Sequence, residues 1–326
     1  MKNKFVASSF FREFKIWDRL KEKPIPFSFD LEITARCNFN CRHCYINLPA
    51  NDAEAMKNEI SLTQIGNIAD QAAAMGSLWC LITGGEPLLR ADFQDIYLLL
   101  KKKGFLVSVY TNASIITDKH VSFFKKFPPR ELEVTVYGVS QKTYERVTRR
   151  PDSYAAFRRG LDLLLKSGLK VRLKAMALRS NVAELPAIAS FCRQYTKDYF
   201  RFDPLLHLRY DGNATRNAEI RGERLSAAEI VAIEQGDDER AATLKKNCRN
   251  LIFQEQEHYD CRHLFHCGAG KESFVVSPEG YFHLCSALRH PECVTDLKQT
   301  TLADSWNDLV PRVHAITSSS PDFLEK

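Results

Sequence analysis

From residue 27 onward, the chain alternates short extended apolar segments with longer segments of helical period, and no other feature limits its fold as strongly. Strands that alternate with helices predict a parallel sheet with right-handed crossover connections. The alternation alone allows either a doubly wound sheet or an incomplete barrel. The strands are predicted at 27–35, 78–83, 106–112, 132–137, 171–178 and 199–208, and the helices at about 62–75, 93–103, 118–126, 153–167 and 182–196.

Local signals mark where several of these helices begin and end. Ser61 precedes one helix and has Gln64 at the third helical position, which is the capping-box pattern. Asn181 and Glu184 form the same pattern near the start of the helix predicted at 182–196. Glycine stands just past three predicted helix ends, at positions 76, 104 and 168.

Three cysteines, Cys37, Cys41 and Cys44, follow the first predicted strand with the spacing C-x3-C-x2-C. They lie on a loop beyond the carboxyl end of a strand, where parallel α/β folds place their chemistry. Thiolates this close together are soft ligands that suit an iron–sulfur cluster, zinc or copper(I). A four-iron cluster held by three cysteines keeps one iron open to a further ligand. The alternatives are incidental cysteines, or a zinc site with His43 as the fourth ligand in a cramped chelate loop.

The composition indicates a globular protein of a reducing compartment. Of the 326 residues, 44% are apolar and 26% are charged, which allows a large core, and the net charge of +6 is scattered along the chain. The sequence shows no signal-peptide pattern and no apolar run of about 20 residues, so we expect a cytoplasmic protein with no membrane association. Ten cysteines in such a chain favour metal binding over disulfides. The short basic runs are typical of solvated helix ends, and we expect no nucleic-acid partner.

The cysteine motif resembles the signature of the radical S-adenosylmethionine (SAM) superfamily. A second motif, the Gly-Gly-Glu-Pro run at 84–87, follows the second predicted strand and resembles the GGEP motif of that superfamily. The resemblance implies an α/β fold, a partial (β/α)6 TIM-like barrel that is open at one side. It also implies a [4Fe-4S] cluster on the three cysteines, with the open iron chelated by the amino and carboxylate groups of SAM.

The same resemblance implies which residues hold SAM. His43 stands where relatives have an aromatic residue near the adenine, and the backbone of the 84–87 turn corresponds to the segment that binds the SAM amino group. Exposed N–H and C=O groups of that turn are expected to grip a zwitterion. Two residues depart from the pattern of the family. Ala113 replaces the glycine of the T-N-G at the end of the third strand, and Tyr137 replaces an acidic residue near the ribose. The alternative is that these segments are ordinary turns and strand ends with a structural role. The predicted cofactor-binding residues are His43, Gly84, Gly85, Glu86, Pro87, Thr111 and Asn112.

Lys174 lies on the fifth predicted strand. Its neighbours on either side are apolar, so the alternation predicts that Lys174 faces the lumen of the barrel. A lysine in that place needs an acidic partner or an anionic ligand.

A second group of cysteines surrounds a hairpin predicted at 273–284, whose turn carries Pro278 and Gly280. Such a hairpin holds two distant cysteines together, as a four-thiolate cluster needs. The pattern resembles the start of the SPASM/twitch extension, which implies at least one auxiliary [4Fe-4S] cluster. Cys248 or a group outside this sequence stays open as the fourth ligand, and a structural zinc ribbon is the alternative. The predicted auxiliary ligands are Cys261, Cys267, Cys285 and Cys293.

Full extensions of this type continue with a further cysteine-rich run, whereas this chain stops at Lys326. We expect either that a second auxiliary cluster is absent or that the sequence is truncated, and we favour truncation. Cys80 and Cys192 are expected to be buried core thiols. The predicted domains are an N-terminal extension at 1–26 with a short helix at 10–17, the barrel at 27–210, a helical linker at 211–250 that serves as a solvated connector, and the auxiliary-cluster domain at 251–326.

The resemblance implies an enzyme that takes one electron from a flavodoxin- or ferredoxin-like reductant, cleaves SAM reductively and abstracts hydrogen with a 5′-deoxyadenosyl radical. Relatives with SPASM-type extensions mostly modify peptides or proteins, so the expected substrate is a peptide or protein side chain. The alternatives are a step in small-molecule cofactor biosynthesis, of the tetrapyrrole or molybdopterin type, and a non-catalytic iron–sulfur electron-transfer protein. Relatives that oxidise sulfatases carry an Asp just after the cysteine that closes the hairpin, and Ser286 here counts against that activity.

Overall fold

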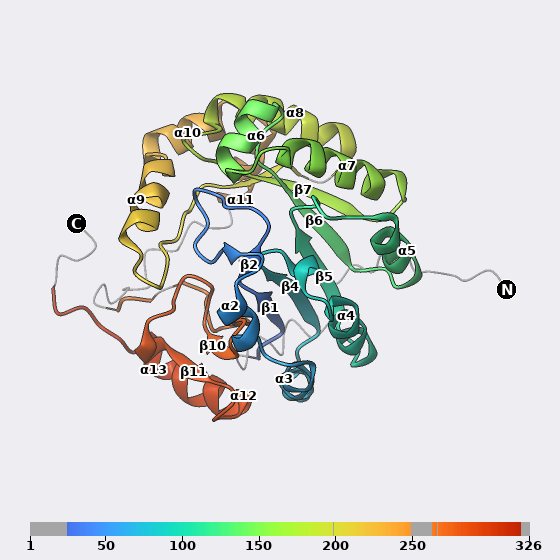
Figure 1. Cartoon of the computed structure of the whole chain (residues 1–326). Coiled ribbons are helices and arrows are strands. Elements are labelled where there is room, and N and C mark those ends of the chain that lie inside the picture. Colours follow the sequence, from blue (N-terminus) through green and yellow to red (C-terminus); the bar gives the residue numbers. More distant parts are fainter. Residues whose placement is uncertain (1–24, 198, 249–262, 266, 321–326) are drawn as a thin grey trace.

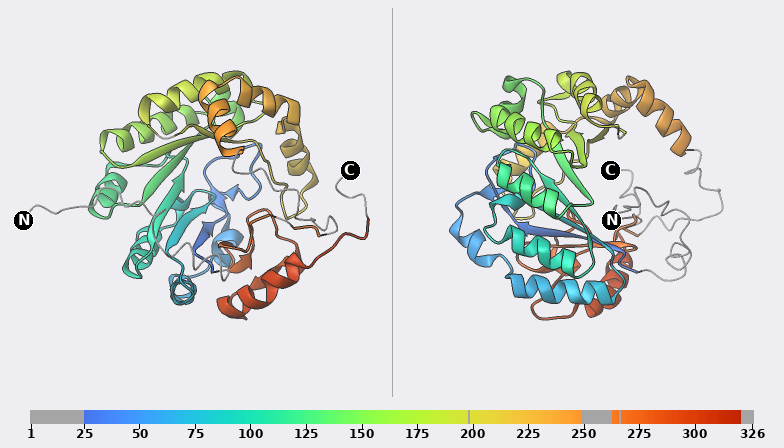
Figure 2. Two further views of the ribbon diagram at one scale, coloured as in Figure 1. Left: turned by 180° about the vertical axis from the view of Figure 1, so that it is seen from behind. Right: turned by 90° about the vertical axis from the view of Figure 1, so that its right-hand side faces the viewer.

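The computed structural model describes residues 25–197, 199–248, 263–265 and 267–320. Within this part of the chain, nine strands form one curved sheet, and helices cover its outer face (Figure 1; Figure 2). The strand order is β11-β10-β9-β1-β4-β5-β6-β7-β8. Because β11 and β8 are the two edges of this order, the described strands form an open barrel. The helix predicted at 10–17 lies outside the described residues.

Six parallel strands, each hydrogen-bonded to the next, build the barrel, and the predicted fold class is confirmed. The strands are β1 (Ser28–Thr34), β4 (Trp79–Gly84), β5 (Leu106–Thr111), β6 (Glu131–Val136), β7 (Val171–Met176) and β8 (Arg201–Asp203). The connecting helices are α3 (Leu62–Ala74), α4 (Phe93–Lys102), α5 (Asp118–Lys126), α6 (Gln141–Thr148), α7 (Ser153–Lys166) and α8 (Leu185–Tyr195). Two short strands, β2 (Arg36–Cys37) and β3 (Leu48–Pro49), and the helix α2 (Ala53–Asn58) lie between β1 and α3.

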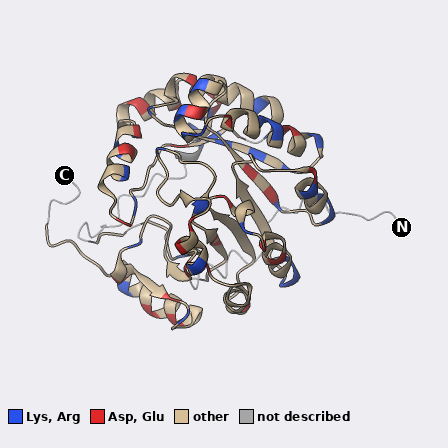
Figure 3. Ribbon diagram, in the orientation of Figure 1, with Lys and Arg blue, Asp and Glu red and all other residues tan. Residues whose placement is uncertain are grey.

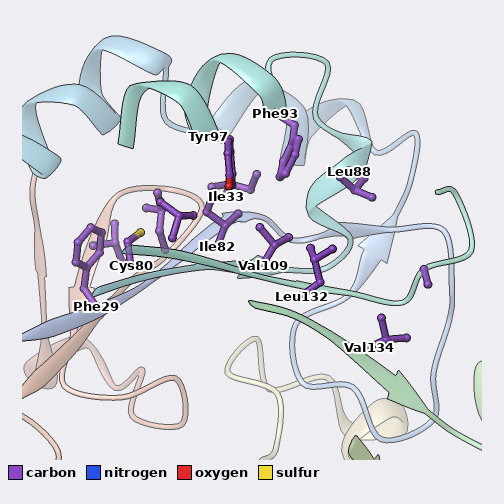
Figure 4. Packing of buried hydrophobic residues seen from close by; sticks show 14 of the residues in the cluster. Phe29, Ile33, Cys80, Ile82, Leu88, Phe93, Tyr97, Val109, Leu132 and Val134 are labelled. Atoms are coloured by element: carbon purple, nitrogen blue, oxygen red, sulfur yellow. The ribbon is translucent and has the colours of Figure 1, made fainter. Parts of the chain in front are cut away.

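The alternation of side chains along β1 separates an apolar outer layer from a polar interior. Phe29 points toward the helices and is buried together with Ile82 of β4 and Tyr97 of α4 (Figure 4). Full burial of such a side chain contributes about 1.5–3 kcal/mol. Asp30 and Glu32 lie on the other face of the strand and line an interior cavity. Because the apolar side chains of β1 pack against the helices, Asp30 and Glu32 face the lumen of the barrel.

The predicted C-terminal hairpin is confirmed, and its strands continue the barrel sheet. β9 (Ser273–Val276) pairs in parallel with β1, β10 (Tyr281–His283) returns antiparallel beside β9, and β11 (Val294–Asp296) completes this side. Phe274 stacks on Phe29 with 5.2 Å between the ring centroids. The segment that carries the predicted auxiliary cysteines is thus joined to the barrel by shared strand pairing.

A helical segment follows the hairpin, but it is interrupted. α12 (Leu302–Asp304) and α13 (Val310–His314) are separated by a wide π turn over Ser305–Leu309. Pro311 has no N–H to donate to the preceding turn, and a wider turn accommodates this loss.

The capping predictions are partly confirmed. Ser61 and Gln64 form the predicted capping box of α3. The box predicted at Asn181 is wrong, because the side chain of Asn181 bridges strand ends instead: its Nδ2 donates to the carbonyl oxygens of Tyr137 and Met176. The glycines at positions 76, 104 and 168 have positive φ values and end their helices as expected.

The polar linker is more ordered than its composition predicts. It contains α9 (Ala214–Glu223) in addition to the expected helices α10 (Ala227–Gln235) and α11 (Asp238–Cys248). Ile220 of α9 is fully buried against Val147 of α6. Because α9 packs on the barrel, the prediction of a solvated connector is wrong for this helix. Among the described helices, none is both long enough and apolar enough to cross a bilayer.

Candidate active site

A cavity of about 470 Å³ opens inside the barrel, and the three cysteines of the C-x3-C-x2-C motif lie on its wall. The loop that carries them is fixed to α6, because the backbone N–H groups of Asn40 and Arg42 donate to carbonyl oxygens of the last turn of that helix at 3.0 and 3.1 Å. Of the predicted cofactor-binding residues, the structure brings His43, Gly84, Gly85, Thr111 and Asn112 to this cavity. Glu86 and Pro87 are buried behind it.

Burial makes the thiols of Cys37 and Cys41 poor acids in the absence of a cation. It raises the pKa of the Cys37 thiol to about 12, and the pKa of the Cys41 thiol also lies well above its usual range because of burial. A metal centre supplies the positive charge that a buried thiolate needs. In the described residues, no three His, Cys, Asp or Glu side chains surround a point where a single ion would sit. In a four-iron cluster each thiolate binds a different iron, so such a cluster does not require the three thiols to surround one point.

Asn112 ties the end of β5 to the cysteine loop. Its Nδ2 donates to Asn38 Oδ1 at 2.9 Å and lies 3.9 Å from Cys37 Sγ. Asn38 in turn donates from its Nδ2 to Ser114 Oγ at 2.7 Å. The strand-end residue predicted beside SAM therefore also fixes the loop on which the cluster would be built.

The two glycines of the 84–87 turn permit a very close approach between strands. A Cβ on Gly84 would lie 2.2 Å from the Thr34 carbonyl oxygen, and a Cβ on Gly85 would lie 2.2 Å from that of Arg36. The expectation that exposed N–H and C=O groups of the turn grip a zwitterion is wrong for two of the N–H groups, because Gly85 N–H donates to the Thr34 carbonyl oxygen and Glu86 N–H donates to that of Arg36. With those donors engaged, the turn offers carbonyl oxygens, which suit an ammonium group.

Glu86 is buried and makes its hydrogen bonds to other residues of the protein. Its carboxylate accepts hydrogen bonds from Thr111 Oγ1 and from the Asn112 backbone N–H, each at 2.8 Å, and so ties the turn after β4 to the end of β5. Complete burial raises the pKa of Glu86 to about 7 despite these bonds. Glu86 is thus placed to position the residues that line the cavity.

His43 is the aromatic neighbour of the cysteines. Its ring lies 5.3 Å from that of Tyr137, and burial lowers its pKa to about 4, so the imidazole is neutral at pH 7. Its buried Nδ1 has no hydrogen-bond partner among the described residues. An unsatisfied polar atom on the cavity wall fits a site that holds a further group.

α9 supports the cysteine loop through an arginine that the sequence did not single out. Arg216 donates to the Cys41 carbonyl oxygen at 2.8 Å and to Asn47 Oδ1 at 3.1 Å. Arg209, just before α9, donates to the Asn47 carbonyl oxygen at 3.0 Å. The only signal available in the sequence was an arginine-rich segment, and such segments usually face solvent.

We expect Arg216→Met to loosen the cysteine loop and to lower the iron retained after anaerobic reconstitution. The lost bonds are charge-assisted, and each contributes about 1.5–3 kcal/mol. Iron and sulfide content and the visible absorbance of the cluster, followed over time, measure the effect. Arg221→Met is the matched control, since Arg221 is exposed on the same helix. Equal iron retention in the two variants would show that the Arg216 contacts do not support the loop.

Lys174 faces the cavity, as the strand alternation predicted. Its Nζ lies 3.0 Å from Glu133 Oε1 and 3.2 Å from Asp203 Oδ2. The pairing supplies the acidic partners that a buried lysine needs. Figure 3 shows basic and acidic residues together on the neighbouring strands β6 and β7.

Arg289, in the C-terminal segment, contacts β1 of the barrel. The guanidinium contacts the carboxylate of Glu32 at 2.5 Å, and Tyr45, directly after the third motif cysteine, donates to Glu32 Oε1 at 2.9 Å. Glu32 is almost completely buried, and burial raises its pKa while Arg289 opposes the shift. Sequence reasoning missed all three residues.

The predicted auxiliary cysteines occupy different environments. Cys285 is half-buried just after β10, Cys293 is buried in a short 3-10 turn, and Cys267 is exposed ahead of β9. Cys261 lies outside the described residues, and Cys248 is the last residue of α11. Cys80 and Cys192 are buried core thiols, as predicted.

Several known proteins are similar to this chain in sequence. AlbA, the antilisterial bacteriocin subtilosin biosynthesis protein of Bacillus subtilis, is 24% identical over 315 residues, which cover 93% of this chain and 64% of AlbA. The Fe-coproporphyrin III synthase of Methanosarcina barkeri is 29% identical over 197 residues, which cover 60% of this chain and 47% of the synthase. The PqqA peptide cyclase of Xanthomonas euvesicatoria is 23% identical and covers 87% of this chain and 75% of the cyclase.

Solved structures share the fold. Streptococcus suis SuiB bound to its precursor peptide SuiA superposes with a TM-score of 0.67 and 16% identity over 93% of this chain and 70% of SuiB. The enzyme anSMEcpe with bound AdoMet gives a TM-score of 0.64 and 12% identity over 90% of this chain and 80% of that enzyme. Residues 31–192, which contain the cysteine motif and the 84–87 turn, match the radical SAM superfamily. The chain therefore carries a radical SAM superfamily domain.

Proposed function

We propose that this protein is a radical SAM enzyme that modifies a side chain of a peptide or protein. The observation that carries the proposal is the cavity into which three cysteines, the glycine turn and two strand ends converge. The similarity to AlbA and to the PqqA peptide cyclase extends over most of the chain and supports a peptide substrate.

In this proposal, Cys37, Cys41 and Cys44 hold a [4Fe-4S] cluster. When bound, the cluster and SAM supply a 5′-deoxyadenosyl radical at the expense of one electron from a flavodoxin- or ferredoxin-like reductant. The residues around them bind and orient SAM. Carbonyl oxygens of Gly84 and Gly85 accept from its amino group.

The remaining predicted residues complete the SAM site. His43 packs as a neutral ring near the adenine, while Thr111 and Asn112 line the wall beside it. Glu86 and Pro87 contribute indirectly, since both are buried behind that wall. The apolar outer layer of the barrel shields the cavity from water on the side that the helices cover.

We further propose an auxiliary [4Fe-4S] cluster beside the C-terminal hairpin. Its ligands are Cys261, Cys267 and Cys285, with Cys293, Cys248 or a group outside this sequence as the fourth. The shared sheet between β9 and β1 supports this placement, because it brings the hairpin to the barrel.

A second candidate function is a radical step in small-molecule cofactor biosynthesis. The 29% identity to the Fe-coproporphyrin III synthase favours it, but that similarity extends over 60% of the chain, compared with 93% for AlbA. The third candidate function is that of a non-catalytic iron–sulfur electron-transfer protein.

Anaerobic reconstitution followed by addition of SAM and dithionite tests the proposal. Formation of 5′-deoxyadenosine and methionine is expected. Loaded clusters without any SAM cleavage would favour an electron-transfer protein. Incubation with the short peptides encoded beside this gene, followed by mass spectrometry, then separates peptide modification from cofactor biosynthesis.

A further inference from the structure

Four charged side chains line the cavity, those of Asp30, Glu32, Lys174 and Asp203, and neighbouring charged groups balance most of their charges. Lys174 is held by Glu133 and Asp203, and its Nζ lies 4.6 Å from the centroid of the Tyr110 ring. Arg201 lies 3.2 Å from Glu133 Oε1. These two basic and two acidic groups compensate each other.

Two carboxylates of β1 also face this cavity. Glu32 is neutralised by Arg289 and receives the Tyr45 hydroxyl. Asp30, two residues earlier on the same side of the strand, has no hydrogen bond and no ion pair among the described residues. Asp30 thus brings an unbalanced negative charge to the cavity.

The environment of Asp30 is unfavourable to that charge. Burial and the neighbouring carboxylate of Glu32 raise its pKa to about 6, and Lys174 opposes the shift only in part. The group is still ionised at pH 8. A half-buried carboxylate without a partner lowers stability, and asparagine would avoid this cost at nearly the same volume. A cationic ligand group placed against Asp30 would remove the penalty.

We propose that Asp30 is a specificity-determining residue that binds a cationic group of the substrate, an ammonium or a guanidinium, in the cavity. The inference rests on the proposed function, because it takes the molecule in this cavity to be the substrate of the radical reaction. It names the substrate class: a side chain or amino terminus that carries a positive charge. Asp30 orients that group and takes no part in hydrogen abstraction.

The test uses the reconstituted holoenzyme at pH 8 and two probes of equal length, butylammonium chloride and 1-butanol. Amines of this type are protonated at that pH, since their pKa is about 10.4. We expect the wild type to bind butylammonium about tenfold more tightly than butanol, a ratio equivalent to about 1.4 kcal/mol. Asp30→Asn should bind the two probes equally, and Asp30→Glu should restore the preference in part.

Two controls establish whether the preference for the cation arises at Asp30. Asp162→Asn removes the same charge from a half-exposed position on α7, where Asp162 pairs with Arg158, and should keep the preference for butylammonium. The SAM dissociation constant should change less than about twofold in Asp30→Asn. The thermal midpoint of that variant at pH 8 should be higher than that of the wild type, and butylammonium should narrow the difference.

A wild type that binds butylammonium and butanol equally would overturn the proposal without reference to any variant. A large loss of SAM binding in Asp30→Asn would also overturn it, because the carboxylate would then serve the cofactor. Failure to cleave SAM would count against the proposed function instead, since probe binding does not require turnover.

Discussion

Cys41→Ala is expected to reduce 5′-deoxyadenosine formation to the level seen without enzyme. With only Cys37 and Cys44 left, the cluster loses one of its three protein ligands, and Cys41 is the most deeply buried of the three thiols. The iron content should fall by the amount that one four-iron cluster accounts for, while the proposed auxiliary cluster remains. Iron analysis, visible absorbance and single-turnover assays with SAM and dithionite measure the effect.

Cys192→Ala is the matched control for this experiment. Cys192 is also a buried thiol, but it lies on α8 among apolar residues outside the cavity. This control should retain the clusters and the cleavage of SAM, with some loss of stability from the smaller side chain. Normal turnover by the Cys41 variant would contradict the assignment of the cluster.

Arg289→Met is expected to lower the free energy of unfolding by about 3–5 kcal/mol, the usual cost of leaving one member of a buried ion pair without its partner. Glu32 is almost fully buried, and after the substitution its carboxylate keeps only the Tyr45 hydroxyl as a donor in this network. Methionine preserves most of the side-chain volume, so the loss reports the charge. Denaturant unfolding of the reconstituted protein under anaerobic conditions, with the same cluster content in each sample, measures it.

The double variant Glu32→Gln with Arg289→Met separates the ion pair from packing. Once the carboxylate is neutral, the missing guanidinium matters less, and we expect the double variant to recover more than half of the lost stability. A double variant no more stable than Arg289→Met would mean that Arg289 acts through packing on the Tyr45 ring, 5.4 Å away.

Much of the framework was predictable because its signals are local. The period of apolar residues placed β1, β4, β5, β6 and β7 within one or two residues, whereas the short strands β2 and β3 were not predicted. The Ser61 box and the three glycines marked helix ends. The β8 strand was predicted too long, since Pro204 stops it after Asp203. Helices α6 and α9 were missed because few of their buried residues are apolar; in α9, Ile220 is the one apolar residue among its buried residues.

The candidate site was predictable only where its residues follow strands directly. Cys37 lies three residues beyond β1, Gly84 ends β4 and Asn112 directly follows β5, so strand order alone brought them to one edge of the sheet. The lumen position of Lys174 followed from alternation in the same way. The ion-pair partners of these residues could not be predicted from the sequence. The period of apolar residues indicates which face of a strand a side chain lies on, but it does not indicate which charged group lies opposite.

The sequence by itself determined the alternating strands and helices of an α/β fold, the position of the cysteine loop and the hairpin, since each depends on residues that are neighbours in the chain. Only the tertiary structure decided that Arg289 neutralises Glu32 across 257 positions and that Arg216 holds the Cys41 carbonyl across 175. It also decided that Asp30 has no hydrogen bond or ion pair among the described residues and is offset only in part by Lys174. The physical reason is that charge pairing depends on distance in space. Strand register and helix packing set that distance, and no local pattern records it.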